Sequence, residues 1–266
     1  MSEQKTKTVD SEEEKTKTNR LEVGMMQKDI SQIIASLRTL LEDCTFSFSQ
    51  EGLSIKAMDC SHVALIDIAL PNANFEKWDV NNDAQIAFRL DDSMKMINLF
   101  EPNSLVRIGW NNDDNILNFF NKSESYKIRT IEPNKADTPL PRIPFDSRIK
   151  FDQEITLGDF IKQLRKIETV SDYITFETSH NWFVLSGKGD SGEAHIKNER
   201  GQVSIDKRDR DDNTTYSLEY LLPFLKTLQK DRTIELAYST AKPLMIRVNL
   251  GGSARMDFYL APRVEN

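Results

Sequence analysis

The chain has 266 residues, of which 38% are hydrophobic and 29% are charged, and its formal net charge is −7. This length is enough for one large domain or for two of ordinary size. No apolar run approaches the roughly 18 residues of a membrane-spanning helix, no signal peptide opens the chain, and the acidic balance argues against nucleic-acid binding over the whole surface.

The first half alternates between helical and strand patterns. Residues 1–19 contain a single strong apolar residue, Val9, which predicts a disordered tail. Apolar residues at i, i+3, i+4 and i+7 spacing then predict a helix over 28–41. The stretch 45–70 alternates around Gln-Glu-Gly, which is typical of a hairpin followed by another strand. The remaining elements predicted here are a short helix over 91–100 and strands at 106–110, 116–120 and 126–131.

The second half repeats this order. An amphipathic helix is predicted over 157–168, a hairpin over 173–186 and a second helix over 218–228. Strands are predicted near 192–206, 233–238, 244–250 and 255–261. The first helices of the two halves begin 127 positions apart, at Ile30 and Leu157, which indicates an internal repeat. The predicted class is α+β, with antiparallel sheet covered on one face by two helices in each half.

A proline-rich segment, residues 130–145, separates the halves. It holds four of the nine prolines and no glycine. Because proline fixes φ and removes an amide donor, the segment is expected to be extended and stiff. It also carries Leu140, Ile143 and Phe145, which a fully solvated linker does not need. We therefore expect a connecting loop that touches another surface, although a plain linker with Phe145 tucked into the next domain remains open. The predicted domains are 20–129 and 146–266.

The helical windows are less acidic than the rest of the chain. Windows 28–41, 91–100, 155–168 and 217–230 contain eight basic and six acidic residues, a balance of +2, which leaves −9 for the remainder. Most of the acids lie at helix starts, where the helix dipole favours them, and the bases lie further along. This favours a shared, weakly basic surface. Solvated faces with charges that simply complement the dipoles are the alternative.

Three motifs carry a resemblance to a known family. The run EGLSIKAMDCSHVALIDIALP at 51–71 resembles the DNA sliding clamp of archaea and eukaryotes, proliferating cell nuclear antigen, with matches at Met58, Asp59, Ser61, His62 and Val63. The ending FYLAPRVE and the loop sequence LPRIPF are similar to the same family, so the resemblance spans about residues 20–265. It implies two similar domains per chain and three chains closed head-to-tail into a pseudo-sixfold ring around duplex DNA. It implies no catalytic activity, no cofactor and no metal.

The resemblance also implies which side chains face the DNA. A clamp that slides needs sequence-independent phosphate attraction rather than base contacts. Matching the family gives five pore positions and helix geometry adds Lys28 and Lys166. Gln32 and Asn98 stand where relatives often have lysine, and Pro223 is expected to kink the fourth helix. The predicted DNA-binding residues are Lys28, Arg38, Lys95, Lys162, Arg165, Lys166 and Lys226.

Partners of such clamps carry a short peptide with a glutamine and a hydrophobic or aromatic plug, the PIP motif. The resemblance implies DNA polymerase, clamp loader, flap endonuclease and DNA ligase as partners through such peptides. Residues implied for the peptide pocket are Met58, His62, Val63, Leu140, Ile143, Pro243, Tyr259, Ala261 and Pro262. The strand 125–131 is expected to pair with 193–199 of a neighbouring chain, through Tyr126, Lys127, Ile128, His195, Ile196 and Lys197.

Several residues suggest chemistry that their spacing does not support. Asp59, Cys60, Ser61 and His62 resemble parts of a nucleophilic site, but consecutive side chains of a strand point to opposite faces and do not converge. The run DKRDRDD at 206–212 lacks the glycine and spacing of a calcium loop, so an exposed turn is predicted there. Candidate ligands without suitable spacing are Cys44, Cys60, His180 and His195.

The sequence thus favours a sliding clamp, cytoplasmic in an archaeon or nuclear in a eukaryote. Two alternatives remain. One is a specialised paralogue that forms one subunit of a heterotrimeric ring, suggested by the long tail and by Pro223. The other is a metal-dependent nucleic-acid-processing enzyme, against which the absence of a clustered acidic motif counts.

Overall fold

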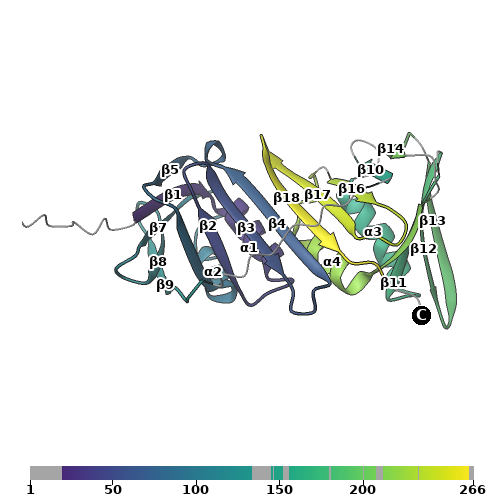
Figure 1. Cartoon of the computed structure of the whole chain (residues 1–266), viewed down its shortest axis with the longest axis horizontal. Helices are drawn as coiled ribbons and strands as arrows, with labels where there is room; N and C mark the ends of the chain where they lie inside the picture. The colour runs from purple at the N-terminus through teal and green to yellow at the C-terminus, as the bar shows by residue number, and fades with distance from the viewer. Residues whose placement is uncertain are drawn as a thin grey trace, which may run out of the picture.

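Two end sheets and a central sheet build an elongated molecule (Figure 1). The computed structural model describes residues 20–133, 145, 147–151, 156–179, 181–199, 201–207, 212–232 and 234–263. No helix among these residues is long and apolar enough to cross a membrane.

Each half contributes two helices and a set of strands. The N-terminal half contains β1 (Arg20–Met26), α1 (Gln27–Leu37), β2 (Asp43–Phe48), β3 (Gly52–Met58), β4 (Ala64–Pro71), η1 (Asn72–Asn74), β5 (Lys77–Val80), β6 (Ala84–Arg89), α2 (Leu90–Ile97), β7 (Leu105–Asn111), β8 (Ile116–Phe120) and β9 (Ser125–Arg129). The C-terminal half contains β10 (Ser147–Phe151), α3 (Leu157–Glu168), β11 (Tyr173–Thr178), β12 (Trp182–Gly189), β13 (Gly192–Glu199), β14 (Ser204–Lys207), β15 (Asp212–Ser217), α4 (Leu218–Thr227), β16 (Ile234–Tyr238), β17 (Leu244–Gly251) and β18 (Ala254–Leu260).

The central sheet runs through both halves. Its nine strands follow the order β14-β10-β16-β17-β18-β4-β3-β2-β6, and the end sheets follow β5-β1-β7-β8-β9 and β13-β12-β11-β15. The halves join where β18 pairs antiparallel with β4, with Tyr259 opposite Leu65. The strands β9 and β13 are outermost in the two end sheets. The expected α+β class is confirmed, with antiparallel sheets and helices that cover them.

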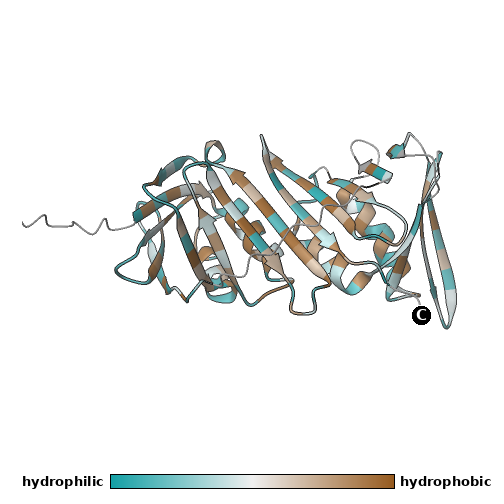
Figure 2. Ribbon diagram, in the orientation of Figure 1, coloured by the Kyte–Doolittle hydropathy of each residue, from teal (hydrophilic) through white to brown (hydrophobic). Residues whose placement is uncertain are grey.

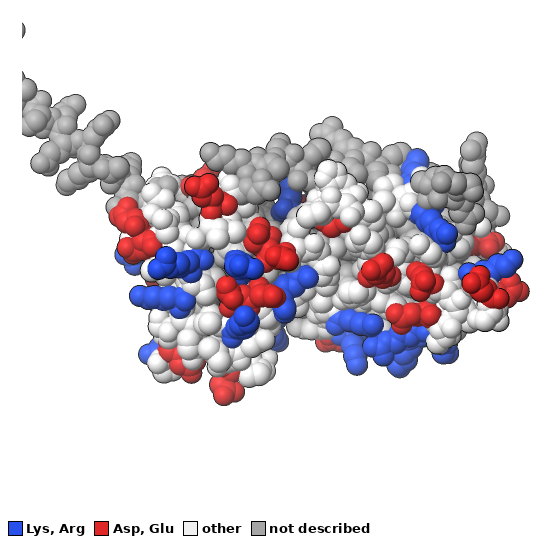
Figure 3. Space-filling view, turned by 90° about the horizontal axis from the view of Figure 1, so that it is seen from below, with Lys and Arg blue, Asp and Glu red and all other residues white. Residues whose placement is uncertain are grey.

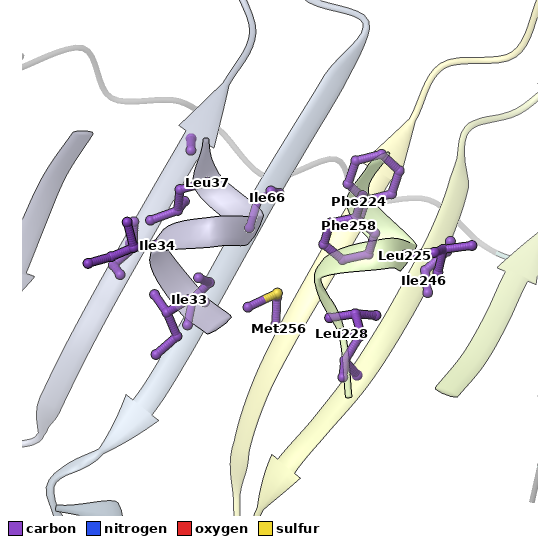
Figure 4. Packing of buried hydrophobic residues seen from close by; sticks show 14 of the residues in the cluster. Ile33, Ile34, Leu37, Ile66, Phe224, Leu225, Leu228, Ile246, Met256 and Phe258 are labelled. Carbon is purple, nitrogen blue, oxygen red and sulfur yellow. The ribbon is translucent and has the colours of Figure 1, made fainter. Parts of the chain in front are cut away.

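Apolar periodicity explains how the helices attach to the sheet. In α1, Ile33, Ile34 and Leu37 are buried at i, i+1 and i+4 spacing, and Ile66 of β4 lies beside the helix (Figure 4). In α4, the ring of Phe224 stacks on Phe258 of β18 at 4.2 Å with an interplanar angle of 11° (Figure 4). Each such side chain contributes roughly 1.5–3 kcal/mol by leaving water. The strands alternate in hydropathy, as half-buried strands do (Figure 2).

The four helices form one row. α1 contacts α2 and α4, and α4 contacts α3. The hydroxyls of Ser36 in α1 and Thr227 in α4 lie 2.7 Å apart, so the row is continuous across the junction of the halves. Since the apolar sides of the helices are buried, their polar sides share one face of the molecule.

A charged network also crosses the junction. Asp67 of β4 and Asp257 of β18 are buried. Asp257 accepts two 2.8 Å hydrogen bonds from Arg247, while Arg255 donates to Asp67 at 3.0 Å and to Asp257 at 2.5 Å. The hydrogen bond to Asp257 raises the pKa of Arg247. Breaking such a buried pair is costly because the remaining charge stays desolvated.

Several element boundaries differ from the sequence prediction. Leu40 and Leu41 follow α1 instead of belonging to it, because the chain turns at Thr39, whose hydroxyl donates to the Ser36 carbonyl. Strands β1, β5, β6, β10 and β15 were not predicted. The strand predicted over 126–131 ends at Arg129, and Ile131 instead bridges to Ala87.

The acidic run at 206–212 is not simply an exposed turn. Asp212 begins β15 and is only 3% exposed. Its carboxylate accepts hydrogen bonds from the Ser147 hydroxyl and from the amide and hydroxyl of Thr240. Those three donors explain the burial of the charge. Residues 208–211 lie outside the described residues.

The segment after Met58 is a turn and not a strand, so the prediction of alternating side chains there was wrong. Asp59 is 6% exposed and accepts hydrogen bonds from the amides of Ser61, Val63 and Ala64. His62 has a φ of 58°, in the left-handed region. The carboxylate therefore holds the turn together.

Candidate nucleic-acid and partner interfaces

The basic residues predicted on the helices are all exposed. On α3, Lys162, Arg165 and Lys166 follow i, i+3, i+4 spacing, so they project from one side of the helix. The described residues that present a basic side chain on the helix row are Lys28, Arg38, Lys95, Lys162, Arg165, Lys166 and Lys226. All seven predicted DNA-facing residues are thus exposed, on the helices of the row or at their ends.

Three of these basic side chains have acidic neighbours. Arg38 lies 2.6 Å from Asp91, Lys95 lies 3.4 Å from Asp92, and Lys162 lies 2.9 Å from Asp159. These pairs are solvent-exposed, and exposed pairs contribute little to stability and are screened by salt. Among the described residues, no ion pair forms at the other four: Lys28, Arg165, Lys166 and Lys226.

The charge of the helix row is weakly positive. With the observed bounds and the cap residue Arg38, the four helices carry seven basic and six acidic side chains, a balance of +1. The whole chain carries −7. Figure 3 shows Lys and Arg gathered along one margin of the C-terminal half, whereas both signs mix over the N-terminal half. The row can attract a polyanion without holding it tightly.

The start of α3 is the most strongly organised helix end. Thr156 and Asp159 form a capping box, in which each side chain bonds the other residue's backbone amide. Hydrogen bonds from Lys162 and then from Thr156 lower the pKa of Asp159 to about 2. The carboxylate thus stays charged and partly offsets Lys162 at neutral pH.

Three further helix positions were singled out in the sequence, namely Gln32, Asn98 and Pro223. Gln32, which stands where relatives often have lysine, is only 6% exposed and so does not lie on the exposed side of α1. Asn98 is exposed at the end of α2. α4 continues through Pro223, which lies on its exposed side.

A second candidate site lies on the face of the central sheet away from the helices, where β3 and β18 end and β4 and β17 begin. The pairing register places Met58, Leu65, Tyr259 and Met245 in one row across β3, β4, β18 and β17. Directly opposed residues of neighbouring strands share a face. Met58 and Tyr259 are half-buried, and burial raises the pKa of Tyr259. The row is apolar with a phenol at its centre.

The turn and the chain end frame this row. The amide of Ala261 donates to the Val63 carbonyl at 2.8 Å, which ties the segment after β18 to the turn before β4. Pro243 and Pro262 are half-buried beside these segments and His62 is exposed. The two remaining pocket predictions, Leu140 and Ile143, lie outside the described residues.

Sequence reasoning missed two members of the row, Leu65 and Met245, which are 4% and 3% exposed. A signal existed for Leu65. Once Met58 is assigned to the pocket, hairpin pairing across the short turn puts Leu65 opposite it. Met245 carries no comparable signal, because its position depends on pairing between segments distant in sequence.

The predicted assembly strands are the outer strands of their sheets. In β9, Lys127 and Arg129 are exposed, Ile128 is buried, and Tyr126 packs edge-on against Phe100 at 5.1 Å. In β13, Ile196 is half-buried and the exposed side chains are those of Glu193, His195, Lys197 and Glu199. The edge β9 is therefore basic, whereas β13 exposes two glutamates against one lysine and is weakly acidic.

Neither a metal site nor an activated nucleophile accompanies these surfaces within the described ranges. No group of three His, Cys, Asp or Glu side chains there is arranged to hold a metal ion. Burial raises the pKa of the Cys44 thiol to about 12, which keeps it in the unreactive thiol form. His180 lies outside the described residues.

Comparisons with known proteins agree with this arrangement. The model of the proliferating cell nuclear antigen N-terminal domain matches residues 19–137. The DNA polymerase sliding clamp of Nitrosopumilus maritimus is 40% identical over 242 residues, covering 90% of this chain and 96% of that protein. The clamp of Cenarchaeum symbiosum is 36% identical over 241 residues with the same coverage.

Solved structures show the same fold. PCNA from Thermococcus kodakaraensis superposes with a TM-score of 0.85 at 20% identity, covering 91% of this chain and all of that one. A. fulgidus PCNA bound to the C-terminal region of FEN-1 gives 0.84 at 20% identity, covering 92% and 99%. The architecture is thus that of a DNA clamp. With the sequence identities above, the chain belongs to the DNA polymerase sliding clamp family, that of proliferating cell nuclear antigen.

Proposed function

We propose that this chain is a DNA sliding clamp, which encircles duplex DNA and tethers DNA polymerase and other replication and repair proteins to it. The observation that carries the proposal is the continuous row of four helices, which carries seven exposed basic side chains. In this proposal the chain catalyses no reaction, and its domains are residues 20–129 and 146–266, joined by the loop 130–145.

The balance of charge suits sliding. Phosphate attraction is independent of sequence and weakens with salt, whereas base contacts would hold the protein at one site. A row with a balance of only +1 attracts the duplex while leaving it free to move. Retention then depends on ring closure and not on affinity.

Ring closure follows from the two outer strands. A head-to-tail contact places the basic β9 edge of one copy against the weakly acidic β13 edge of the next. Contacts between two β9 edges or two β13 edges would oppose like charges. Because one chain carries both complementary edges, we propose a ring of three identical copies. A mixed ring with paralogues is the competing outcome.

Partner proteins would dock on the row formed by Met58, Leu65, Tyr259 and Met245. Methionine adapts to different apolar side chains, which suits a pocket shared by several partners. The A. fulgidus clamp was solved with the C-terminal region of FEN-1. We propose that PIP-type peptides of DNA polymerase, clamp loader, flap endonuclease and DNA ligase bind here. The relatives with the highest identity reported above are archaeal, so we place the protein in the cytoplasm of an archaeal cell.

A topological experiment tests the function. The chain is loaded onto nicked circular plasmid by a cognate clamp loader, isolated by gel filtration at moderate salt, and divided into two samples. We expect co-elution with the circle and release after the plasmid is linearised. Equal retention on linear DNA would overturn the proposal, since a protein held by direct contacts needs no closed circle.

A peptide measurement tests the docking row. Met58→Ser is expected to weaken binding of a PIP peptide about tenfold or more, since one well-packed methionine contributes more than 1 kcal/mol. Leu140→Ser with Ile143→Ser tests the two positions outside the described residues in the same way. Lys56→Ser, on the same strand and exposed, is the matched control and is expected to change nothing. Unchanged affinity in all variants would remove the row from the proposal.

A further inference from the structure

The turn between β3 and β4, residues 59–63, contacts the C-terminal half in two places. Its Val63 carbonyl accepts a 2.8 Å hydrogen bond from the amide of Ala261, in the segment after β18. Its Asp59 carboxylate accepts a 3.4 Å hydrogen bond from the hydroxyl of Tyr220, on α4. The turn that frames the docking row is therefore held both by the end of the chain and by a helix of the row.

These two contacts belong to one closed circuit. The segment after β18 continues to Arg263, whose amide donates to the Thr215 carbonyl of β15 at 2.8 Å. The Arg263 guanidinium also lies over the ring of Tyr173, at 3.8 Å from the ring centroid. β15 leads directly into α4, which carries Tyr220. The turn, the chain end, β15 and α4 therefore constrain one another beside the docking row.

The Asp59 carboxylate needs several donors because it is buried. The residue is 6% exposed, and one of its oxygens accepts hydrogen bonds from the amides of Val63 and Ala64 at 2.8 and 2.7 Å. The other oxygen accepts from the Ser61 amide at 3.1 Å and from the Tyr220 hydroxyl. Among the described residues, Tyr220 alone reaches this carboxylate from outside the turn. Because a buried charge that loses a donor is destabilised, removing the hydroxyl weakens the attachment of the turn to α4.

The Tyr220 side chain is suited to this contact. It is half-buried and packs against the hydrophobic core. Burial, and then the neighbouring Asp59 charge, raise the pKa of the phenol above its ordinary value. The hydroxyl therefore keeps its proton at neutral pH and serves as a donor. Since the ring is already fixed by its own packing, little side-chain entropy is lost when the hydroxyl bonds the turn.

We propose that Tyr220 is a positioning residue for partner docking, which holds the turn 59–63 where it frames the docking row. The inference rests on the proposed docking of partner peptides to that row. Met58 ends β3 directly before the turn, so a displaced turn changes the surface that the row presents to a peptide. A turn ordered in advance also lowers the entropic cost of binding. The helix row thereby supports the partner site as well as the proposed DNA-facing surface.

Peptide binding to a conservative variant tests the proposal. Tyr220→Phe removes the hydroxyl and keeps the ring, and we expect the Kd of a fluorescent PIP-type peptide to rise about three- to tenfold, as for the loss of one hydrogen bond. Glu219→Gln, at an exposed position of the same helix, is the matched control and should leave the Kd unchanged. An unchanged Kd in Tyr220→Phe, while Met58→Ser weakens binding, would overturn the inference and leave the docking row in place. If Met58→Ser also bound normally, the docking row and the inference would both be refuted.

Amide hydrogen exchange in the free protein tests whether the hydroxyl acts through the turn. The amides of Val63 and Ala64 should exchange faster in Tyr220→Phe, while those of the distant hairpin β12–β13 should not change. Faster exchange in both places would indicate general destabilisation and contradict a positioning role. In an Asp59→Ala background, Tyr220→Phe should raise the peptide Kd no further. An additive loss of affinity there would show that Tyr220 does not act through the turn.

Discussion

The two halves repeat one order of elements yet carry their charge differently. In the N-terminal half, Arg38 and Lys95 of the helix row each face an aspartate within ion-pair distance. In the C-terminal half, Arg165, Lys166 and Lys226 have no acidic partner among the described residues. Packing constrains the apolar side of every helix, so that side recurs in both halves. The solvent side carries no such constraint and has diverged.

The N-termini of the helices also differ from one another. α3 begins with a complete capping box, whereas the N-caps of α1, α2 and α4 have no side-chain hydrogen bond to any residue that the structure describes. The outer strands differ in sign, since β9 is basic and β13 weakly acidic. These contrasts give the two ends of the molecule different charge, as the proposed head-to-tail ring requires.

Reversing the sign of the β9 edge should have the largest effect. Lys127→Glu with Arg129→Glu places like charges opposite the proposed β13 edge, and we expect loss of the trimer at micromolar concentration. Light scattering after size exclusion measures this. Adding Glu193→Lys and Glu199→Lys to the same chain should restore the trimer. Trimers in the first variant would show that the edges do not meet.

Cutting the network between the halves should come next. Asp257 is 1% exposed at its side chain and binds both Arg247 and Arg255. Asp257→Ala leaves two arginines without their shared partner, and we expect a loss of about 3 kcal/mol in the free energy of unfolding. Denaturant unfolding measures the loss. Asp79→Ala, an exposed aspartate on β5, should change stability by less than about 0.5 kcal/mol.

The basic side chains of the two halves differ in how many form ion pairs, which predicts an unequal contribution to DNA binding. Arg165→Ala with Lys166→Ala should lower the affinity for a short duplex more than Arg38→Ala with Lys95→Ala. Each phosphate contact removed should reduce the salt slope by about 0.9. Fluorescence anisotropy over a salt series measures both quantities. Asp91→Asn with Asp92→Asn removes the acidic partners of Arg38 and Lys95 and should raise the affinity for DNA. Equal losses of affinity in the two alanine double variants would contradict the prediction.

Disrupting the capping box should cause the smallest loss of stability, and this loss should depend on pH. The pKa of Asp159 is lowered to about 2 in the folded chain from an ordinary 3.8. Its contribution is therefore present above about pH 4 and is lost as the pH falls toward 2. The melting temperature of wild type should exceed that of Asp159→Asn at pH 6, and the gap should close toward pH 2. Thr156→Ala should cost about 1 kcal/mol at pH 6.

Local patterns predicted much of this fold. The helices α2, α3 and α4 and the hairpins β2–β3 and β11–β12 follow from periodicity and turn residues, because their partners lie close in sequence. Strands such as β1 and β10 have their pairing partners far along the chain, at β7 and β16, and no local period reveals them. Asp212 was misplaced for the same reason, since its donors Ser147 and Thr240 are distant.

The candidate sites show the same division. The basic helix positions were predictable because a helix displays its exposed side in the sequence itself. Gln32 lines a crevice together with Leu250 and Ala254 of the other half, which no local pattern reveals. Leu65 and Met245 join the docking row only through strand register. Contacts made across the junction of the halves are therefore what the sequence alone did not reveal.

The pairing of β18 with β4 has a consequence for synthesis on the ribosome. β4 (Ala64–Pro71) is made early, whereas its partner β18 (Ala254–Leu260) belongs to the other half of the chain and is made much later. During most of translation, β4 exposes an unpaired edge, Ala64–Ala69, which is the kind of edge that invites aggregation. Docking of β18 therefore also protects the edge of the N-terminal half.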